Sequence, residues 1–334
     1  MYQQSASIKK PNIVVIGGGA GSFTLLRSLK DLTPNITALV NMADDGGSTG
    51  ILRDELGVLP PGDVRQCLVA LSRTSEMREL FNYRFSEGMF KGHSFGNLFL
   101  TALEKTTGSF ATAVETASKV LNVRGTVLPI TLDNVRLVLH HQDGTFTSGE
   151  HLIDVANFGA TNMRPKLSLD PEATINPKAA KAIAEANVVV IAPGDLYTSL
   201  GSLLIVDGVA GALKTTRAKI VYVCNLVVKP GQTDGFSVFD HASEIERFAG
   251  PVLDYVLYNT ASPPETLMQY YSKYHADLVF YDTKDFESAH YQAVGMPLVA
   301  KQPVLPHDSD VLASYRSVIR HNARAVAKFM ISII

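Results

Sequence analysis

The chain has little of what marks secreted, membrane or fibrous proteins. Its 334 residues include no tryptophan and two cysteines, Cys67 and Cys224. Two cysteines so far apart cannot form a disulfide framework or a CxxC metal knuckle, which favours a reducing, cytoplasmic setting. No apolar run approaches the roughly 18 residues of a membrane span. The apolar stretch 13–16 is also too short for a signal peptide.

An excess of charge of one sign is also lacking. Lysine and arginine number 30, aspartate and glutamate number 32, and the net charge is −2. A near-neutral chain is a poor general binder of polyanions, so duplex nucleic acid is not expected as the main partner. The remaining classes are intracellular enzymes and binders of small ligands.

Short β-branched runs alternate with longer segments of helical periodicity. Most of the runs are apolar throughout, which is typical of strands buried on both faces of a parallel sheet. The predicted strands are 12–16, 36–42, 188–192, 219–224, 254–258 and 278–281; the predicted helices are 22–31, 63–73, 76–85, 94–105, 110–121, 177–186, 237–247, 264–273 and 311–330. This alternation predicts an α/β fold with a doubly wound, mostly parallel sheet of the Rossmann type.

One region departs from this alternation. Segments 123–130, 135–140 and 145–151 read as strands, with a hairpin turn at Asp143-Gly144. We therefore predict an antiparallel β insert over 123–168, followed by an extended connection at 167–172. The whole of 1–334 is predicted to be one domain carrying this insert; two lobes meeting near 123–170 are the alternative.

The glycine loop after the first strand is the strongest local feature. Gly17, Gly18, Gly19 and Gly21 lead into a helix expected to begin at Ser22 or Phe23. Glycines allow a ligand to approach the main chain, and amides at a helix start attract anions. The loop predicts a phosphate or pyrophosphate site, in which Ser22 caps the helix or donates to a phosphate oxygen. A tight turn without a ligand is the alternative.

The loop after the second strand, 41–50, contains two adjacent carboxylates. Asp44 and Asp45 could bond a ribose or hold Mg²⁺ on a phosphate ligand, and Ser48 and Thr49 add hydroxyl groups. The alternative is a solvated turn.

The next polar residues surround two predicted helix starts. Arg53 and Arg65 are candidate phosphate forks or surface ion pairs, and Asp63 can cap the helix at 63–73. His93 and Asn97 flank another helix start, where His93 bonds either a ligand or its own loop.

The second half repeats the pattern of a strand followed by a polar loop. Gly194 and Asp195 follow the strand 188–192, and a helix is expected to open near Tyr197 and Thr198. Asn225 ends another strand, where it could read a base or sugar edge. No nucleophile motif appears, so no catalytic residue is assigned. The nine histidines show no spacing typical of a transition-metal site.

Taken in order, these motifs resemble the bacterial gluconeogenesis factor (YvcK-like) family. The matching segments are GGGAGS, NMADDGGSTGILRDELGVLPPGDVRQCLVAL, GHSFGN, LNVRGTVLPIT, APGDLYTS, VYVCNL and PGQTDGFS, within roughly residues 12–330. This family is related to CofD, the 2-phospho-L-lactate transferase of deazaflavin coenzyme synthesis. The resemblance implies a CofD-like α/β fold that binds UDP-sugars such as UDP-N-acetylglucosamine, or NAD(P)-type ligands, with a role in cell shape during growth on gluconeogenic carbon.

The resemblance also implies site residues. The glycine loop would hold the diphosphate, the loops of Asp44-Asp45 and of Gly194-Asp195 would close over it, and Asn225 would lie near the nucleotide. Arg320 resembles a nucleotide-sugar contact of the family, with Tyr274 as its companion. Two positions depart from the pattern. Ala20 stands where relatives often carry Thr. Asp195 stands where they often carry Ser, and would repel a bare diphosphate unless a cation intervenes.

Three functions are therefore open. The first is a non-catalytic nucleotide-sugar sensor without an obligatory cofactor, and the second is a CofD-like transferase that uses Mg²⁺. The third, an NAD(P)-dependent oxidoreductase, rests on the glycine loop alone. We expect a cytoplasmic protein, with a homodimer as the default assembly.

Overall fold

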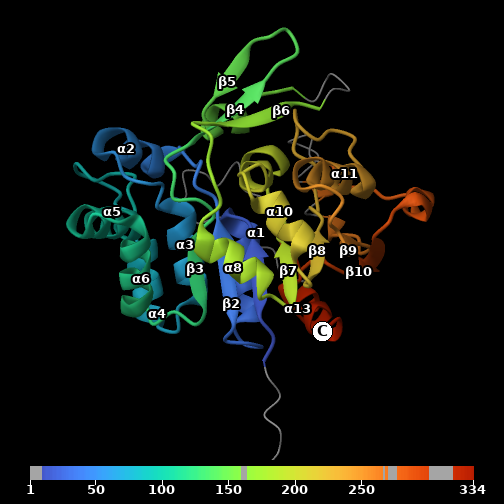
Figure 1. Cartoon of the computed structure of the whole chain (residues 1–334), viewed down its shortest axis with the longest axis horizontal. Helices are drawn as coiled ribbons and strands as arrows, with labels where there is room; N and C mark the ends of the chain where they lie inside the picture. The colour runs from blue at the N-terminus through green and yellow to red at the C-terminus, as the bar shows by residue number, and fades with distance from the viewer. Residues whose placement is uncertain (1–9, 159–163, 266–267, 270–276, 301–318) are drawn as a thin grey trace, which may run out of the picture.

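A seven-stranded parallel sheet forms the centre of the molecule (Figure 1). The computed structural model describes residues 10–158, 164–265, 268–269, 277–300 and 319–334. The strand order is β10 (Gln292–Met296), β9 (Tyr255–Asn259), β8 (Lys219–Val223), β7 (Val188–Ile191), β1 (Ile13–Ile16), β2 (Ile36–Val40) and β3 (Thr126–Pro129). Every neighbouring pair is parallel. The predicted α/β fold is confirmed.

The two central strands explain why their sequences are apolar throughout. β1 reads IVVI and β7 reads VVVI, and all eight side chains are buried. They pair in register, with Ile13 opposite Val188 and Ile16 opposite Ile191. Both faces of the sheet are therefore covered at its middle.

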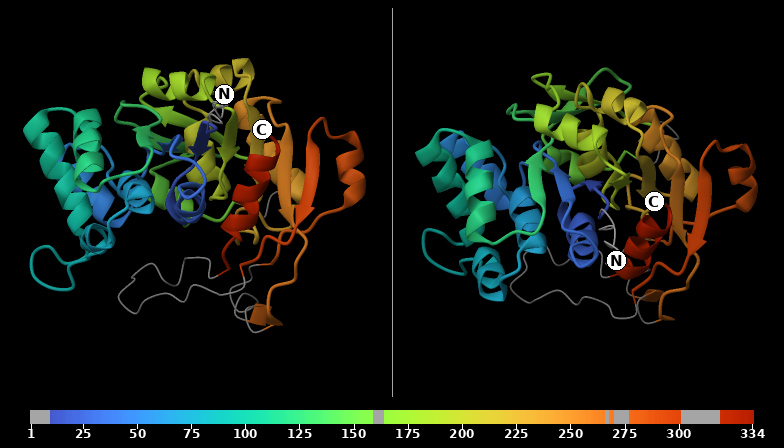
Figure 2. Two further views of the ribbon diagram at one scale, coloured as in Figure 1. Left: turned by 90° about the horizontal axis from the view of Figure 1, so that it is seen from below. Right: turned by 60° about the horizontal axis from the view of Figure 1, so that its bottom comes forward.

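Helices form a layer on each face of the sheet (Figure 2). On one face lie α8 (Pro177–Ala184), α10 (Val209–Thr215) and α11 (Val238–Ala249); on the other lie α1 (Gly19–Leu29), α3 (Gly62–Leu71) and α13 (Ala323–Ser332). A flank beside β3 consists of α2 (Gly47–Leu56), α4 (Ser75–Asn82), α5 (Phe95–Thr107) and α6 (Phe110–Val120). In the described part of the chain, no helix combines the length and apolarity needed to cross a bilayer.

The predicted antiparallel insert is present with different bounds. β4 (Arg136–His140), β5 (Phe146–Ser148) and β6 (Lys166–Asp170) form a separate sheet, and α7 (Glu150–Asp154) follows β5. This sheet lies above the carboxyl ends of the parallel strands (Figure 1). The assignment of 123–130 to the insert was wrong, because β3 pairs in parallel with β2. The expected connection at 167–172 is largely β6.

Other boundaries differ from the sequence prediction as well. Helix α1 begins at Gly19 rather than residue 22, and the expected loop 41–50 runs into α2 from Gly47. The expected strand 278–281 makes only isolated bridges, and β10 was not predicted. Most of the predicted helix 264–273 and the first part of 311–330 lie outside the described residues. The assignment of the whole chain to one domain stays a prediction.

Candidate functional site

The strand order reverses direction between β1 and β7. From β1 the chain continues outward to β2 and β3, whereas from β7 it continues the other way to β8, β9 and β10. The loops that leave β1 and β7 therefore diverge. In open α/β sheets this divergence leaves a crevice at the carboxyl ends of the strands, where ligands bind. The glycine loop and the loop 192–195 lie at this point, and we use "crevice" for the place between them.

Two glycines of the first loop are required by geometry. Gly19 has φ +61°, in the left-handed region, and a Cβ built there would meet no atom within 4 Å. A Cβ on Gly21 would lie 1.9 Å from the carbonyl oxygen of Pro193. Gly19 therefore faces open space, and Gly21 lets the loops after β1 and β7 touch.

The amide of Gly19 already has a partner. It donates a hydrogen bond of 3.0 Å to Oδ1 of Asp63, in the first turn of α3. A Cβ on Gly18 would lie 1.9 Å from the other carboxylate oxygen of Asp63. An anion approaching this loop must therefore displace Asp63 or share its place through a cation.

Ser22 lies beneath the same loop. Because α1 begins at Gly19, Ser22 falls after the first turn and does not cap the helix. Its side chain is fully buried, and its Oγ has no hydrogen-bond partner among the described residues.

The carboxylates of Asp44 and Asp45 point in different directions. Asp44 accepts from the Gly46 amide at 3.0 Å and lies against Gly62, whose Cβ would be 2.8 Å from Asp44 Oδ2. Thr49 is also hydrogen-bonded to Asp44, while burial raises the pKa of the Asp44 carboxyl.

Asp45 joins the loop to the insert. It accepts from the His151 amide at 2.8 Å, which caps α7, and lies 3.4 Å from Nη1 of Arg136 on β4. Among the described residues, no group of three or more His, Cys, Asp or Glu side chains is arranged to hold a metal ion.

Sequence reasoning missed Glu150, the first residue of α7. Burial raises its pKa well above the usual range, and neighbouring carboxylates add to this. We use "acidic rim" for the five carboxylates that interact here: Asp44, Asp63, Glu150, Asp154 and Asp195. Lys229 pairs with Asp154 and lies 3.1 Å from Asp195. No local motif marks Glu150, because only the folding of the insert brings it to this edge.

Arg53 is buried beneath the acidic rim rather than exposed to a ligand. It donates to the carbonyl oxygen of Asp44 at 3.2 Å, to Oδ1 of Asn134 at 2.7 Å and to the carbonyl of Val135. Its guanidinium therefore fastens the loop after β2 to the chain entering the insert.

Four other predicted residues form one hydrogen-bonded chain between α2, α3 and α5. Arg65 donates to Asn97 at 2.9 Å, Asn97 donates to Ser48 at 3.3 Å, and Ser48 lies 2.9 Å from Nδ1 of His93. Arg65 also donates to Asn82 at 2.7 Å. The chain fixes the starts of α2 and α5 beside the crevice.

The predicted residues after β7 divide between the loop and the core. Gly194 and Asn225 bond each other twice, at 3.3 and 2.9 Å, which links the loops after β7 and β8. Tyr197 and Thr198 lie inside a π-helical turn, Leu196–Gly201, and are buried. Burial raises the pKa of Tyr197, which is hydrogen-bonded to Glu244.

The C-terminal candidates are only partly described. Tyr274 lies outside the described residues. Arg320 is half-buried and precedes His321, whose Nε2 lies 2.9 Å from the carbonyl oxygen of Cys224 at the end of β8. Burial lowers the pKa of His321 to about 4, so this imidazole is neutral near pH 7 and donates to that carbonyl. The segment of Arg320 therefore reaches the same edge of the sheet.

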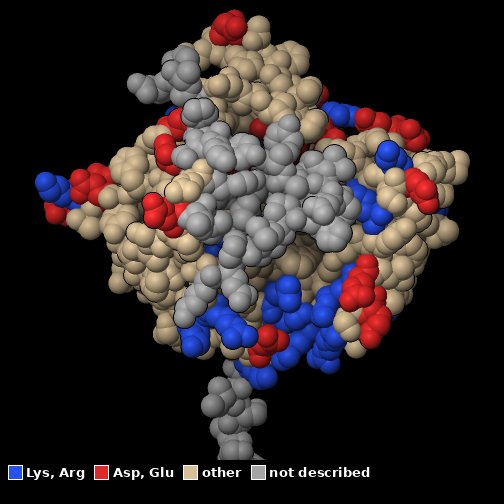
Figure 3. Space-filling model, turned by 180° about the vertical axis from the view of Figure 1, so that it is seen from behind, with Lys and Arg blue, Asp and Glu red and all other residues tan. Residues whose placement is uncertain are grey.

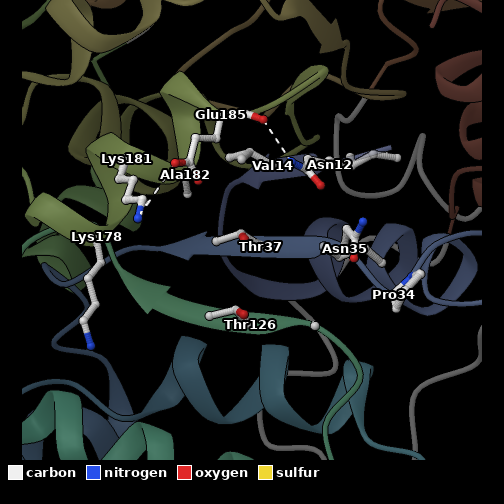
Figure 4. A pocket seen from close by; sticks show the side chains of 13 residues that line it. Asn12, Val14, Pro34, Asn35, Thr37, Thr126, Lys178, Lys181, Ala182 and Glu185 are labelled. Atoms are coloured by element: carbon white, nitrogen blue, oxygen red, sulfur yellow. Dashed lines mark hydrogen bonds and ion pairs between the residues drawn. The ribbon is translucent and has the colours of Figure 1, made fainter. Parts of the chain in front are cut away.

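A separate groove of about 400 Å³ lies at the amino ends of β1, β2 and β3 (Figure 4). Lys178 and Lys181 of α8 and Glu185 directly after it line the groove together with Asn12 and Asn35. None of the predicted site residues lies there, so the groove is distinct from the crevice.

A family model described as 2-phospho-L-lactate transferase CofD matches residues 13–299. The chain belongs to the CofD family. The predicted family resemblance is thereby confirmed, and the match includes the glycine loop, the insert and the loops after β7 and β8.

Members of this family named gluconeogenesis factor are similar over nearly the whole chain. The protein of Halalkalibacterium halodurans is 40% identical over 96% of this chain and 96% of its own length. That of Bacillus subtilis is 37% identical over 98% of this chain and 99% of its own. A solved structure from Bacillus halodurans, described as a member of the UPF0052 family, is 37% identical and superposes with a TM-score of 0.87, covering 97% of this chain and 99% of that one.

Proposed function

We propose that this CofD-family protein is a gluconeogenesis factor that binds a nucleotide sugar of the UDP-N-acetylglucosamine type. The diphosphate would lie in the crevice between the loops after β1 and β7, and binding would report nucleotide-sugar supply to the control of cell shape during gluconeogenic growth. The observation that carries this proposal is the open space at Gly19, at the point where the strand order reverses.

The acidic rim determines how a diphosphate could bind. Asp63 and Asp195 lie on either side of the crevice, and bare phosphates would be repelled by them. Carboxylate oxygens are ligands that Mg²⁺ prefers, usually together with phosphates and water. We therefore infer that the nucleotide sugar binds with Mg²⁺, near Asp44 rather than Asp45, because Asp45 is bonded to the insert. NAD(P)-type ligands would use the same loop.

The second candidate function is a CofD-like transfer of a phospholactyl group from a guanosine diphosphate carrier with Mg²⁺. The acidic rim favours it, because metal-assisted phosphoryl chemistry uses carboxylates. The binding function remains our first choice, because no acid/base pair is evident and because the chain has no tryptophan to stack on a deazaflavin.

Calorimetric titration separates these functions. The protein is titrated with UDP-N-acetylglucosamine, GDP and NAD, each with and without Mg²⁺. We expect saturable heat with the UDP-sugar in the presence of Mg²⁺; its absence would exclude the proposal. Turnover of a phospholactyl donor with a deazaflavin acceptor would instead establish the transferase. Size-exclusion chromatography of the same samples tests the expected homodimer.

The cellular role is tested by complementation. A Bacillus subtilis strain lacking its 37% identical relative is supplied with this chain and grown on a gluconeogenic carbon source. We expect normal cell shape to return, and a failure to restore it despite normal protein levels would contradict the proposed role.

A further inference from the structure

Positive side chains gather on the face of the molecule that carries α1, α4 and α13. Figure 3 shows them as a blue band across the lower part of the view from behind. We use "basic face" for six residues: Arg27 of α1 and Lys30 directly after it, Arg73 after α3, Arg78 of α4, and Arg324 and Lys328 of α13. Helices α1 and α13 pack against each other, and α3 contacts both α1 and α4, so the six belong to one continuous surface.

Three of these cations have a partner within the described part of the chain. The guanidinium of Arg27 lies 5.7 Å from the ring centroid of Phe23. Nζ of Lys30 donates to the carbonyl oxygens of Ala70 and Ser72 at 2.8 and 2.9 Å, and Arg78 donates to Ser72 at 3.2 Å. The negative end of the α3 dipole explains why the positive charges of Lys30 and Arg78 lie there. It does not account for Arg324, which lies in the first turn of α13, where a helix dipole disfavours a cation.

Carboxylates do not neutralise the basic face. Within the described part of the chain, none of the six forms an ion pair, and the carboxylates close to them in sequence are those of Asp31, Glu76 and Glu79. Among these nine described residues, positive charges therefore outnumber negative ones by three, in a chain whose net charge is −2. The ends of α1 and α3 lie at the amino edge of the sheet, opposite the acidic rim, whereas α13 begins beside the segment of Arg320, at the carboxyl edge.

Exposed apolar side chains accompany these cations. Leu32, just after α1, is 40% exposed, and Ile331 and Ile334, at the end of α13, are 38% and 55% exposed. Cations next to apolar side chains suit a lipid surface, where the charges meet anionic headgroups and the apolar groups enter the acyl boundary. Nucleic acid would offer phosphates but no apolar layer for the three aliphatic side chains.

We propose that the basic face is a docking surface for an anionic membrane. The docking is peripheral and electrostatic, so it weakens as salt screens the charges. None of the six cations of the basic face is among the residues of the proposed nucleotide-sugar site.

Co-sedimentation with vesicles tests the proposal. The full chain is mixed with vesicles of pure phosphatidylcholine and with vesicles in which about a third of the lipid is phosphatidylglycerol. We expect binding to the second kind only, with at least a tenfold loss between low and high salt. Each cation near an anionic surface contributes about 1 kcal/mol, or roughly fivefold. Charge reversal in R324E/K328E should therefore reduce binding at least tenfold.

A matched charge reversal provides the control. K178E/K181E changes the charge by the same amount on α8, on the other face of the sheet, and should retain vesicle binding. Melting temperatures and titration with UDP-N-acetylglucosamine confirm that both variants fold and keep the crevice intact. Equal loss in both variants, equal binding to neutral vesicles, or binding to a short RNA or DNA duplex without binding to vesicles would overturn the proposal.

Discussion

The carboxylate of Asp63 accepts a hydrogen bond from the amide of Gly19, at 3.0 Å. The sequence predicts that this amide faces an anion, so the protein's own carboxylate stands where a phosphate oxygen is expected. In this arrangement the negative charge of Asp63 lies between an approaching diphosphate and the positive end of the α1 dipole. The effect of Mg²⁺ on affinity is therefore the property that reports most directly on Asp63.

Asp63→Asn should change the Mg²⁺ dependence of ligand binding. The amide oxygen of Asn can still accept from Gly19, but the negative charge is gone. Without Mg²⁺ we expect UDP-N-acetylglucosamine to bind about fivefold to tenfold more tightly than to the wild type, or about 1 kcal/mol. With Mg²⁺ this advantage should disappear. Calorimetry measures the affinity for UDP-N-acetylglucosamine with and without Mg²⁺, for this variant and for the exposed control Asp31→Asn. If both variants bind as the wild type does under each condition, the diphosphate lies elsewhere.

Gly19→Val should abolish ligand binding, because its side chain would fill the open space at the crevice. The substitution also costs about 1–2 kcal/mol of stability, since Gly19 has a positive φ. Gly57→Val is a matched control: Gly57 has φ +63° with no atom within 4 Å of its Cβ position, at the end of α2. Both variants should lose similar stability in urea unfolding, and only Gly19→Val should lose affinity. Retained affinity would remove the loop from the site.

Arg53→Lys should lower stability rather than ligand affinity. A lysine cannot keep the two-pronged contact with Asn134 and Val135, so buried acceptors lose their donor and about 2 kcal/mol is lost. The same change at Arg136, whose side chain is 44% exposed, should cost less than about 1 kcal/mol. Urea unfolding compares the two. A variant of normal stability that fails to bind the UDP-sugar would restore the original interpretation of Arg53 as a phosphate fork.

Glu150→Gln should stabilise the protein at alkaline pH. Because burial raises the pKa of Glu150, the folded state holds this proton to a higher pH than the unfolded state does. Stability from this group is therefore present at low pH and is lost as pH rises from the unfolded pKa, about 4.3, to the raised folded value. We expect no difference near pH 4 and a gain on the order of 1 kcal/mol at pH 8. Glu172→Gln, at an exposed position, is the control, and an unchanged melting temperature at pH 8 would contradict the expected burial.

The sequence was sufficient to predict β1, β2, β7, β8 and β9 of the sheet and the polar loops that follow β1, β2 and β7. Continuous apolar runs such as IVVI are typical of strands buried on both faces, and glycines directly after such a strand indicate a loop at its carboxyl end. Parallel pairing then brings that loop to the same edge as the loops of Asp44 and Gly194. These are local signals whose consequences follow from the fold class.

The partners of the individual polar side chains could not be predicted in this way. Asp45 is adjacent to Asp44 in the sequence, yet its partners His151 and Arg136 belong to the insert. Their contacts depend on how the insert is placed over the sheet, which no local pattern encodes. The same reason explains why Arg53 appeared as a candidate phosphate ligand and Glu150 did not appear.

The packing of α13 against α1 has a consequence for the order in which the chain can fold. Val326 and Met330 of α13 are buried in the helix layer that also contains α1. About 300 residues separate the two helices in the sequence. During synthesis, the surface of α1 that contacts α13 stays uncovered until residues 323–332 leave the ribosome. This late contact leaves apolar surface of α1 open to chaperones while about 300 further residues are synthesised.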